Sequence, residues 1–311
     1  MKKYTNISDI INIPKIIQEA IQLKQNPYQF EKLGQHKTLV MLFFNSSLRT
    51  RLSTEKAAKN LGMKVMVLNV NDAWELEFDD GTIMNLNTSE HVKEAAQVIS
   101  QYTDIIALRA FPTLKDKQKD ESEFVLNSFV KYASVPVVNM ESSTAHPLQA
   151  LTDAITIEEL KTKPKPKVVL SWAPHPKALP HAVANSFVSM MQEIEVDFSI
   201  THPKGYELNP GVTKEIPINH NQEEALKNAD FVYVKNWSSY EDYGKIVSQD
   251  PNWMLTKEKL CEAKFMHCLP VRRNVVVEDA VLDSDNSVVI HEANNRTYAA
   301  QIVLKKILEN L

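Results

Sequence analysis

The segment TLVMLFF at residues 38–44 runs directly into NSSLRTR at residues 45–51. The apolar run is typical of a buried strand, and the helix-forming residues 55–61 that follow end at Gly62, a natural helix stop. Hydroxyl and guanidinium groups at a helix N-terminus indicate a site for an oxyanion such as phosphate, because free backbone N–H groups and the helix dipole also attract it. A serine N-cap followed by two solvated arginines explains the segment equally well, so both interpretations stay open at this point.

The composition is that of a soluble globular protein long enough for two domains: 311 residues, 43% hydrophobic and 24% charged. The net charge of −4 gives no electrostatic argument for a nucleic-acid or anionic-membrane partner. No apolar run is long enough to span a bilayer, and the N-terminus lacks the apolar core of a signal peptide. Cys261 and Cys268 form neither a disulfide framework nor a zinc pattern. We therefore expect a cytoplasmic enzyme or binding protein with reduced cysteines.

Short apolar runs alternate with amphipathic stretches along the whole chain, which indicates an α/β fold with parallel sheets covered by helices. We expect two doubly wound domains, residues 1–143 and 144–292, with a C-terminal helix at 293–311 that folds back onto the first domain. The expected strands are 38–44, 64–70, 104–109, 135–139, 167–172, 195–201, 230–235, 264–267 and 287–291. The expected helices, besides the one after residue 51, are 88–101, 121–132, 146–160, 178–193 and 221–228.

The six glycines form neither a dinucleotide-binding fingerprint nor a P-loop. Phosphate chemistry in this chain must therefore use side chains and a helix start, which favours the anion-site interpretation of residues 45–51. In parallel sheets ligands bind beyond the carboxyl ends of the strands, and the other polar clusters of this chain fall at such places.

Arg109 ends an apolar strand, where a buried charge costs several kcal/mol unless it is paired or reaches a cleft. His146 and Gln149 share one face at the start of a helix and offer two hydrogen-bond donors to one small acceptor, such as a carbonyl oxygen. A structural ion pair explains the arginine equally well, and an ordinary helix cap explains the His-Gln pair.

Cys268 follows another apolar run and is a nucleophile, a hydrogen-bonding group or an inert core residue. Arg272 and Arg273 come directly after it, and Arg296 follows the last expected strand. Arginines therefore follow four separate strand ends. Together with the His-Gln pair and the cysteine, they indicate a small substrate that carries two or three negative charges.

These motifs together resemble the aspartate/ornithine carbamoyltransferase family. Residues 47–51 resemble its Ser-x-Arg-Thr-Arg loop for carbamoyl phosphate, and residues 146–149 resemble its His-Pro-x-Gln motif. Residues 267–270, His-Cys-Leu-Pro, match the ornithine-type branch, and residues 292–296 resemble its Glu-x-x-Asn-Arg segment. The resemblance spans nearly the whole chain, in order and with the family's spacing.

One departure from the family pattern concerns the second substrate. Ornithine transcarbamylases have an aspartate that faces the free α-amino group of ornithine, and this chain has Lys235 there. A lysine would repel an α-ammonium group by several kcal/mol at low effective dielectric, whereas acylation of the amine removes that charge. The chain therefore resembles the acylornithine branch, in which Lys235 can pair with the α-carboxylate.

The resemblance implies that the carbamoyl group of carbamoyl phosphate moves to the δ-amine of an N-acylornithine, in arginine biosynthesis, without a metal or an organic cofactor. It implies a homotrimer with shared active sites, in which Trp74 is donated across the interface, and a trefoil knot in the second domain. It implies that Arg109, His146, Gln149, Cys268 and Arg296 are catalytic. The implied contacts with carbamoyl phosphate also include Ser47, Leu48, Arg49, Thr50, Trp74, Pro147, Leu148 and Leu269. The implied contacts with the acylornithine are Glu141, His175, Lys235, Leu269, Arg272, Ser89 and Glu90.

The acyl group depends on the position fifteen residues after Trp74, which is glutamate in the acetyl branch and proline in the succinyl branch. Here it is Ser89, which removes the repulsion that a glutamate would exert on a succinyl carboxylate, and Arg272 could pair with that carboxylate. We therefore predict N-succinyl-L-ornithine as the acceptor. Glu90 keeps N-acetyl-L-ornithine as the alternative, because a shift of one residue would bring in its carboxylate. An ornithine transcarbamylase or a non-catalytic homologue are further alternatives.

Overall fold

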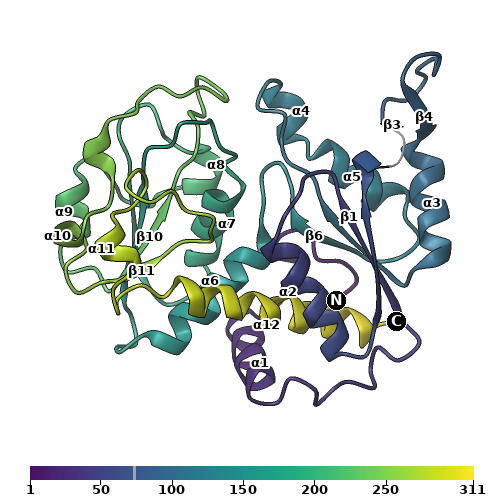
Figure 1. Cartoon of the computed structure of the whole chain (residues 1–311), viewed down its shortest axis with the longest axis horizontal. Coiled ribbons are helices and arrows are strands. Elements are labelled where there is room, and N and C mark those ends of the chain that lie inside the picture. Colours follow the sequence, from purple (N-terminus) through teal and green to yellow (C-terminus); the bar gives the residue numbers. More distant parts are fainter. Residues whose placement is uncertain (73–74) are drawn as a thin grey trace. The chain divides into compact units, whose positions relative to one another are not determined.

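The computed structural model describes residues 1–72 and 75–311, and they divide into two compact units. Unit 1 comprises residues 1–148 and 296–311, and unit 2 comprises residues 149–295. The chain enters unit 2 within helix α6 (Pro147–Leu160) and returns to unit 1 within helix α12 (Val289–Leu308), as Figure 1 shows. Both divisions lie a few residues after the expected boundaries of 143/144 and 292/293.

Unit 1 contains a four-stranded parallel sheet with the strand order β2-β1-β5-β6, as the alternation of apolar runs predicts. The two inner strands are buried along their length, which explains their continuous apolar sequences. A separate parallel pair is formed by β3 (Glu75–Glu77) and β4 (Thr88–His91). The strands of the main sheet are β1 (Thr38–Phe43), β2 (Lys64–Asn69), β5 (Ile105–Arg109) and β6 (Val137–Glu141).

Helices cover both faces of this sheet. One core cluster joins side chains of β1 and β5 to α3 (Val92–Tyr102) and α5 (Phe124–Tyr132), and Figure 1 shows α1 (Ile13–Gln25), α2 (Arg49–Asn60) and α12 on the other side. A short helix, α4 (Lys117–Glu121), precedes α5. Helix α2 ends where the sequence predicts: Gly62 has φ +80°, and a Cβ there would lie 1.9 Å from the carbonyl oxygen of Glu31.

Unit 2 contains a five-stranded parallel sheet with the order β11-β10-β7-β8-β9. Its core on one face joins β7 and β10 to three short helices, and on the other face Phe187 of α7 stacks on Tyr233 with ring centroids 4.2 Å apart. The strands are β7 (Lys167–Trp172), β8 (Asp197–Thr201), β9 (Ile218–Asn219), β10 (Phe231–Lys235) and β11 (Lys264–Met266). The helices are α7 (Ala182–Met191), α8 (Pro210–Thr213), α9 (Gln222–Leu226), α10 (Lys257–Leu260) and α11 (Asp279–Leu282).

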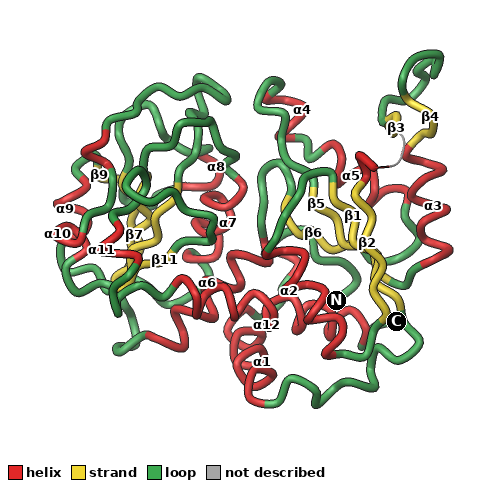
Figure 2. Tube along the Cα trace, in the orientation of Figure 1, coloured by secondary structure: helices red, strands yellow, loops and turns green. Residues whose placement is uncertain are grey.

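The expected architecture of parallel sheets covered by helices is therefore confirmed, but some local predictions are wrong (Figure 2). The expected strand at 287–291 is reduced to one bridge between Ser287 and Phe265, after which α12 begins. A short apolar run fits a strand and a buried helix equally well, and here the helix is formed. The expected helix at 88–101 begins only at Val92, because the four residues before it pair with β3 as β4. The expected helix at 121–132 is divided between α4 and α5.

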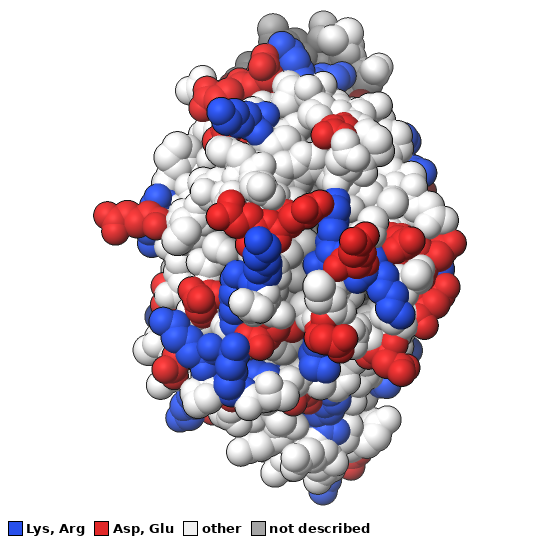
Figure 3. Space-filling view, turned by 90° about the vertical axis from the view of Figure 1, so that its left-hand side faces the viewer, with Lys and Arg blue, Asp and Glu red and all other residues white. Residues whose placement is uncertain are grey.

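Among the described residues, no helix combines the length and the apolar character needed to cross a membrane. On the face of unit 2 that Figure 3 shows, Lys and Arg side chains alternate with Asp and Glu side chains. This face offers no extended patch of one sign, which agrees with the near balance of charges in the sequence.

Candidate active site

The candidate site residues of unit 1 lie where the strand order of its sheet reverses, between β1 and β5. Ligands bind at such switch points in open parallel sheets. The loop after β1 and the loop after β5 are joined there, because the amide of Phe44 donates to the carbonyl oxygen of Arg109 at 2.9 Å. The side-chain oxygen of Asn45 also accepts from the amide of Phe111 at 2.7 Å. The sheet topology therefore brings Arg49 and Thr50, at the start of α2, near Arg109.

The start of α2 has the features of an anion site. Helix α2 begins at Arg49, and its N-cap residue, Leu48, provides no side-chain cap. The hydroxyl of Ser47 accepts from the amide of Thr50 at 3.3 Å, which orders the loop against the first turn. Apart from this bond to Thr50, the positive end of the helix is suited to a bound anion.

Two guanidinium groups meet at Thr50. Its hydroxyl accepts from Nη2 of Arg296 at 2.8 Å and from Nη1 of Arg109 at 3.4 Å. Arg109 is ion-paired with Glu141, and Nε2 of His146 lies 3.4 Å from the same carboxylate. All five side chains are buried. Two permanent cations face one carboxylate in this cluster, so an anionic ligand would balance the remaining positive charge.

His146 is held neutral by its surroundings. Burial is the largest cause, followed by the positive charges of Arg296 and Arg109, and together they lower the pKa of His146 well below its ordinary value of 6.5. At neutral pH the imidazole therefore carries one N–H group and can donate a hydrogen bond without adding a charge.

Two residues of unit 1 have surroundings that the sequence did not indicate. Arg296 does not follow a strand at a helix start; it lies well inside α12 and reaches Thr50 from there. Glu141, expected among the contacts with the acylornithine, directs its carboxylate to Arg109 and His146. In this structure Glu141 therefore holds the side chains of Arg109 and His146 in place.

The candidate residues of unit 2 also lie at a switch point, between β7 and β10. Lys235 is the last residue of β10, and its carbonyl oxygen accepts from the amide of Ala173 at 3.3 Å. The ammonium of Lys235 is buried and donates to the carbonyl oxygen of Asn236 at 3.0 Å. In the part of the chain that the structure describes, it has no carboxylate partner, so it is suited to a negatively charged ligand.

His175, Arg272 and Lys235 form a positively charged group. Nε of Arg272 donates to Nε2 of His175 at 3.1 Å, and Nδ1 of His175 lies 2.8 Å from the carbonyl oxygen of Lys177. Burial and the nearby charges of Lys235 and Arg272 lower the pKa of His175. The neighbouring Arg273 was expected to line the same cleft. It is instead ion-paired with Asp279 and Asp283 at 2.9 and 2.7 Å, which gives it a structural role.

Gln149 is clamped by two buried carboxylates. Its amide nitrogen donates to Asp153 at 2.6 Å and to Glu292 at 3.0 Å. The second carboxylate oxygen of Glu292 accepts from the amide of His267 at 3.0 Å, so it also fixes the residue before Cys268. The sequence predicted that this nitrogen donates to a small acceptor, and in this structure it donates to the two carboxylates.

Cys268 is half-buried and faces the hydroxyl of Tyr233. Burial, followed by the charge of Asp153, raises the pKa of Tyr233 well above its ordinary value, so the phenol stays protonated. Leu269 has φ +53°, an uncommon conformation for leucine, and its amide donates to Nδ1 of His267 at 2.8 Å. The backbone around the Leu269 carbonyl is thereby held in one orientation.

Ser89 and Glu90 differ in their environment. The pairing of β3 with β4 is irregular between Glu75 and Leu76, and Ser89 is left without a partner while Glu90 pairs with Leu76. Such a bulge re-aims the extra side chain, and Ser89 is exposed whereas Glu90 is half-buried. Trp74 lies outside the described residues.

The sequence contained no direct signal for the supporting residues Asp153 and Tyr233. Asp153 lies one helical turn after Gln149, a spacing that allows contact but occurs in most helices. Tyr233 was visible only as part of an apolar strand. Pro147 and Leu148 form the first turn of α6, and the carbonyl oxygen of Pro147 accepts from the hydroxyl of Tyr4 at 3.1 Å.

Replacing Glu292 by glutamine should lower kcat/KM for the carbamoyl transfer that the sequence resemblance implies by roughly 10- to 100-fold, because it removes the charge that holds Gln149 and the amide of His267, a loss of about 1–3 kcal/mol. The steady-state rate of phosphate release would give kcat/KM for the variant and the wild type. Glu159→Gln is the matched control, since Glu159 lies on α6 ten residues after Gln149 and accepts from Asn295. Equal activity of both variants and the wild type would contradict the clamp.

Comparison with known proteins identifies the family. Residues 2–159 match the carbamoyl-P binding domain of aspartate/ornithine carbamoyltransferases, and residues 180–307 match their Asp/Orn binding domain. The chain therefore belongs to the aspartate/ornithine carbamoyltransferase family.

Several similar relatives belong to the acylornithine branch. The N-succinylornithine carbamoyltransferase of Bacteroides thetaiotaomicron is 48% identical over the full length of both chains. The N-acetylornithine carbamoyltransferase of Xylella fastidiosa is 35% identical over 92% of this chain and 93% of its own. A solved N-acetyl-L-ornithine transcarbamylase superposes with a TM-score of 0.92, at 34% identity over 99% of this chain and 100% of its own. The resemblance seen in the sequence is confirmed.

Proposed function

We propose that this chain transfers the carbamoyl group of carbamoyl phosphate to the δ-amine of N-succinyl-L-ornithine, giving N-succinylcitrulline and phosphate, as a step of arginine biosynthesis. The observation that carries the choice of an acylated acceptor is the buried ammonium of Lys235 at the switch point of unit 2. The full-length identity of 48% to an N-succinylornithine carbamoyltransferase supports it independently.

In this proposal the donor is bound by the anion site of unit 1. Ser47, the amide of Leu48, Arg49 and Thr50 bind the phosphate, with Trp74 from a neighbouring subunit. Arg109, Arg296 and neutral His146 direct positive charge and an N–H group at the carbamoyl oxygen. Donors and charges that are already oriented toward an oxygen stabilise the negative charge that it acquires in the transition state. This stabilisation is commonly the largest contribution to the rate enhancement of acyl transfer.

The acceptor is positioned by groups of unit 2. The carbonyl oxygen of Leu269 and the thiol of Cys268 orient the neutral δ-amine, and Gln149 helps to hold the carbamoyl group. The amine nitrogen forms a bond to the carbamoyl carbon, the bond from that carbon to the phosphate oxygen breaks, and one amine proton passes to the departing phosphate. Cys268 needs to form no covalent intermediate, and alignment of the two substrates supplies much of the rate.

Lys235 discriminates between free and acylated ornithine. An α-ammonium group near a buried lysine would be repelled by about 4 kcal/mol at 4 Å and an effective dielectric of 20. In an N-acylornithine that charge is absent, and Lys235 can pair with the α-carboxylate, with His175 beside it.

Ser89 and Arg272 favour succinyl as the acyl group of the acceptor. The exposed Ser89 brings no negative charge, and Arg272 can pair with the distal carboxylate. Among the solved relatives is a Glu-to-Ser variant of N-acetyl-L-ornithine transcarbamylase in complex with carbamyl phosphate and N-succinyl-L-norvaline. We propose that Ser89 occupies the position of that glutamate.

Turnover of three acceptors tests the function. We expect kcat/KM to be highest with N-succinyl-L-ornithine, lower with N-acetyl-L-ornithine and at least about 100-fold lower with ornithine, as the charge argument for Lys235 requires. Preference for free ornithine would overturn the assignment of Lys235. Preference for the acetyl compound would retain the acylornithine class and overturn the succinyl assignment.

N-acetyl-L-ornithine is the second candidate. Glu90 is the observation in its favour, because its carboxylate lies next to Ser89 in β4, and several N-acetylornithine carbamoyltransferases are 34–35% identical to this chain. A non-catalytic homologue is the remaining alternative, and an assay without phosphate release from any acceptor would favour it.

We also propose a cytoplasmic homotrimer with shared active sites and a trefoil knot in its second domain. Large apolar side chains are exposed along α2 and the edge strand β2, namely Leu48, Leu52, Met66 and Leu68. An exposed apolar strip beside an edge strand is typical of a subunit interface. Light scattering should give three times the mass of one chain, and a monomer at assay concentration would contradict the trimer.

A further inference from the structure

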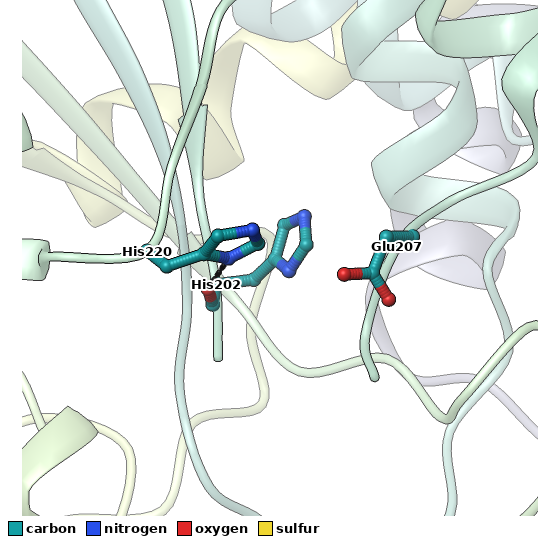
Figure 4. A group of neighbouring side chains, drawn as sticks. All are labelled: His202, Glu207 and His220. Atoms are coloured by element: carbon teal, nitrogen blue, oxygen red, sulfur yellow. Dashed lines mark hydrogen bonds between the residues drawn. The ribbon is translucent and has the colours of Figure 1, made fainter. Parts of the chain in front are cut away.

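Two histidines and a glutamate gather at one edge of unit 2, outside the residues assigned above (Figure 4). His202 follows β8, His220 follows β9, and Glu207 lies in the segment between them. One potential ligand atom of each residue lies within 4.8 Å of those of the other two. Two neighbouring strand ends thus bring together three side chains that bind transition metals.

The backbone holds both imidazoles in the tautomer that suits a metal. Nδ1 of His202 lies 2.9 Å from the carbonyl oxygen of Pro203, and Nδ1 of His220 lies 2.9 Å from the carbonyl oxygen of His202. A carbonyl oxygen only accepts, so each Nδ1 carries the proton, and the Nε2 lone pair of the neutral ring remains for a ligand. Metal-binding histidines nearly always have such a partner on their other nitrogen.

The three side chains are also supported by their surroundings. The ring of His202 is buried and lies at centroid distances of 5.1 Å from His220 and 6.2 Å from Trp237. The carboxylate of Glu207 accepts from the amide of Gly205 at 2.9 Å, which fixes its direction and leaves further lone pairs. The carboxylate and both rings are therefore each held by a backbone group.

We propose that His202, Glu207 and His220 bind one divalent transition-metal ion of the zinc class. Imidazole ligands favour Zn²⁺, Co²⁺, Ni²⁺ and Cu²⁺, whereas Mg²⁺ and Ca²⁺ prefer oxygen ligands alone. Two histidines and one carboxylate are a known ligand set for Zn²⁺, with a fourth position for water.

The position of the site indicates a structural role. None of the three ligands is among the residues used in the proposed transfer, and β7 lies between β8 and β10, the strand that carries Lys235. The ion would tie the ends of β8 and β9 together. His202 packs on Trp237, whose indole N–H donates to the carbonyl oxygen of Tyr206 at 2.8 Å, next to Glu207. Metal binding would therefore brace the segment that follows Lys235.

The experiment uses the whole chain, stripped of metal with a chelator and titrated with Zn²⁺ and, separately, Co²⁺ by calorimetry. We expect one ion per chain and a higher Tm when it is bound. His220→Ala and Glu207→Gln each remove one ligand from a half-buried or exposed position, so both should fold. Each variant should lower the affinity for the metal ion by at least roughly 10- to 100-fold, because even the loss of a residue that only supports a ligand has an effect of that size.

His36→Asn is the matched control, since His36 is an exposed histidine of unit 1. This variant should bind the metal as tightly as the wild type and show the same rise in Tm. Failure of the wild type to retain an ion, or affinity unchanged in both His220→Ala and Glu207→Gln, would overturn the site. Carbamoyl transfer by the stripped protein is a separate readout, so the two proposals can fail independently.

Discussion

Arg49→Ala should reduce kcat/KM for carbamoyl phosphate by about 100- to 1,000-fold. Arg49 begins α2 at the proposed phosphate site, where its guanidinium adds charge-assisted hydrogen bonds to the field of the helix N-terminus. Loss of such a group costs about 3–4 kcal/mol, and each 1.36 kcal/mol is a factor of ten in rate. The effect should appear mainly as weaker binding of carbamoyl phosphate, measured by calorimetry and by the KM for that substrate.

Lys56→Ala is the control for this variant, because Lys56 is an exposed cation on the same helix. It should leave the affinity for carbamoyl phosphate within about twofold, since exposed charges contribute little. Near-normal affinity in Arg49→Ala would refute the phosphate site at the start of α2. Equal weakening in both variants would show that only the general positive charge of the helix matters.

Ser89→Glu should lower kcat/KM for N-succinyl-L-ornithine by about 100-fold or more and largely preserve turnover of N-acetyl-L-ornithine. A carboxylate introduced near the distal carboxylate of the succinyl group places like charges together, which costs several kcal/mol in a site shielded from water. The neutral acetyl group carries no such charge. The ratio of kcat/KM for the two acceptors, measured in parallel, is the relevant quantity.

Asn87→Glu adds the same charge at another exposed position, just before β4. It should leave the ratio of the two acceptors almost unchanged. If Ser89→Glu also leaves the ratio unchanged, Ser89 does not face the acyl group, and Glu90→Gln becomes the variant to compare. A shift caused equally by both substitutions would point to long-range charge instead of contact.

Local patterns in the sequence predicted most of the elements. Runs such as residues 38–44 and 230–235 are strands because continuous apolar side chains suit strands buried on both faces. Gly62 ends α2 because its backbone conformation and the space beside Glu31 exclude a side chain. The run at 287–291 was misread because its length and composition fit a strand and a helix equally well, and only the contact with Phe265 and the helix that follows decide between them.

The chemistry-bearing residues could likewise be found in the sequence, because they fall at strand ends, and strand ends in parallel sheets share one edge. Arg49, Arg109, His146 and Cys268 were proposed in this way, and Lys235 was proposed from the family resemblance. Their protonation states and hydrogen-bond partners could not be predicted from the sequence. These properties depend on burial and on neighbouring residues that local sequence patterns do not specify. The low pKa of His146 and the hydrogen bonds from Gln149 to two buried carboxylates are examples.

By itself, then, the sequence determined the alternation of strands and helices, the family and the residue types available for chemistry, since each of these is encoded in short segments. Tertiary structure alone decided which residues meet. Thr50 and Arg296 are separated by 246 positions and Gln149 and Glu292 by 143, yet both pairs are in hydrogen-bond contact. Both contacts form because α12 places residues from the end of the chain beside earlier segments. The path of α12 is determined by the packing of the whole core and not by any short segment.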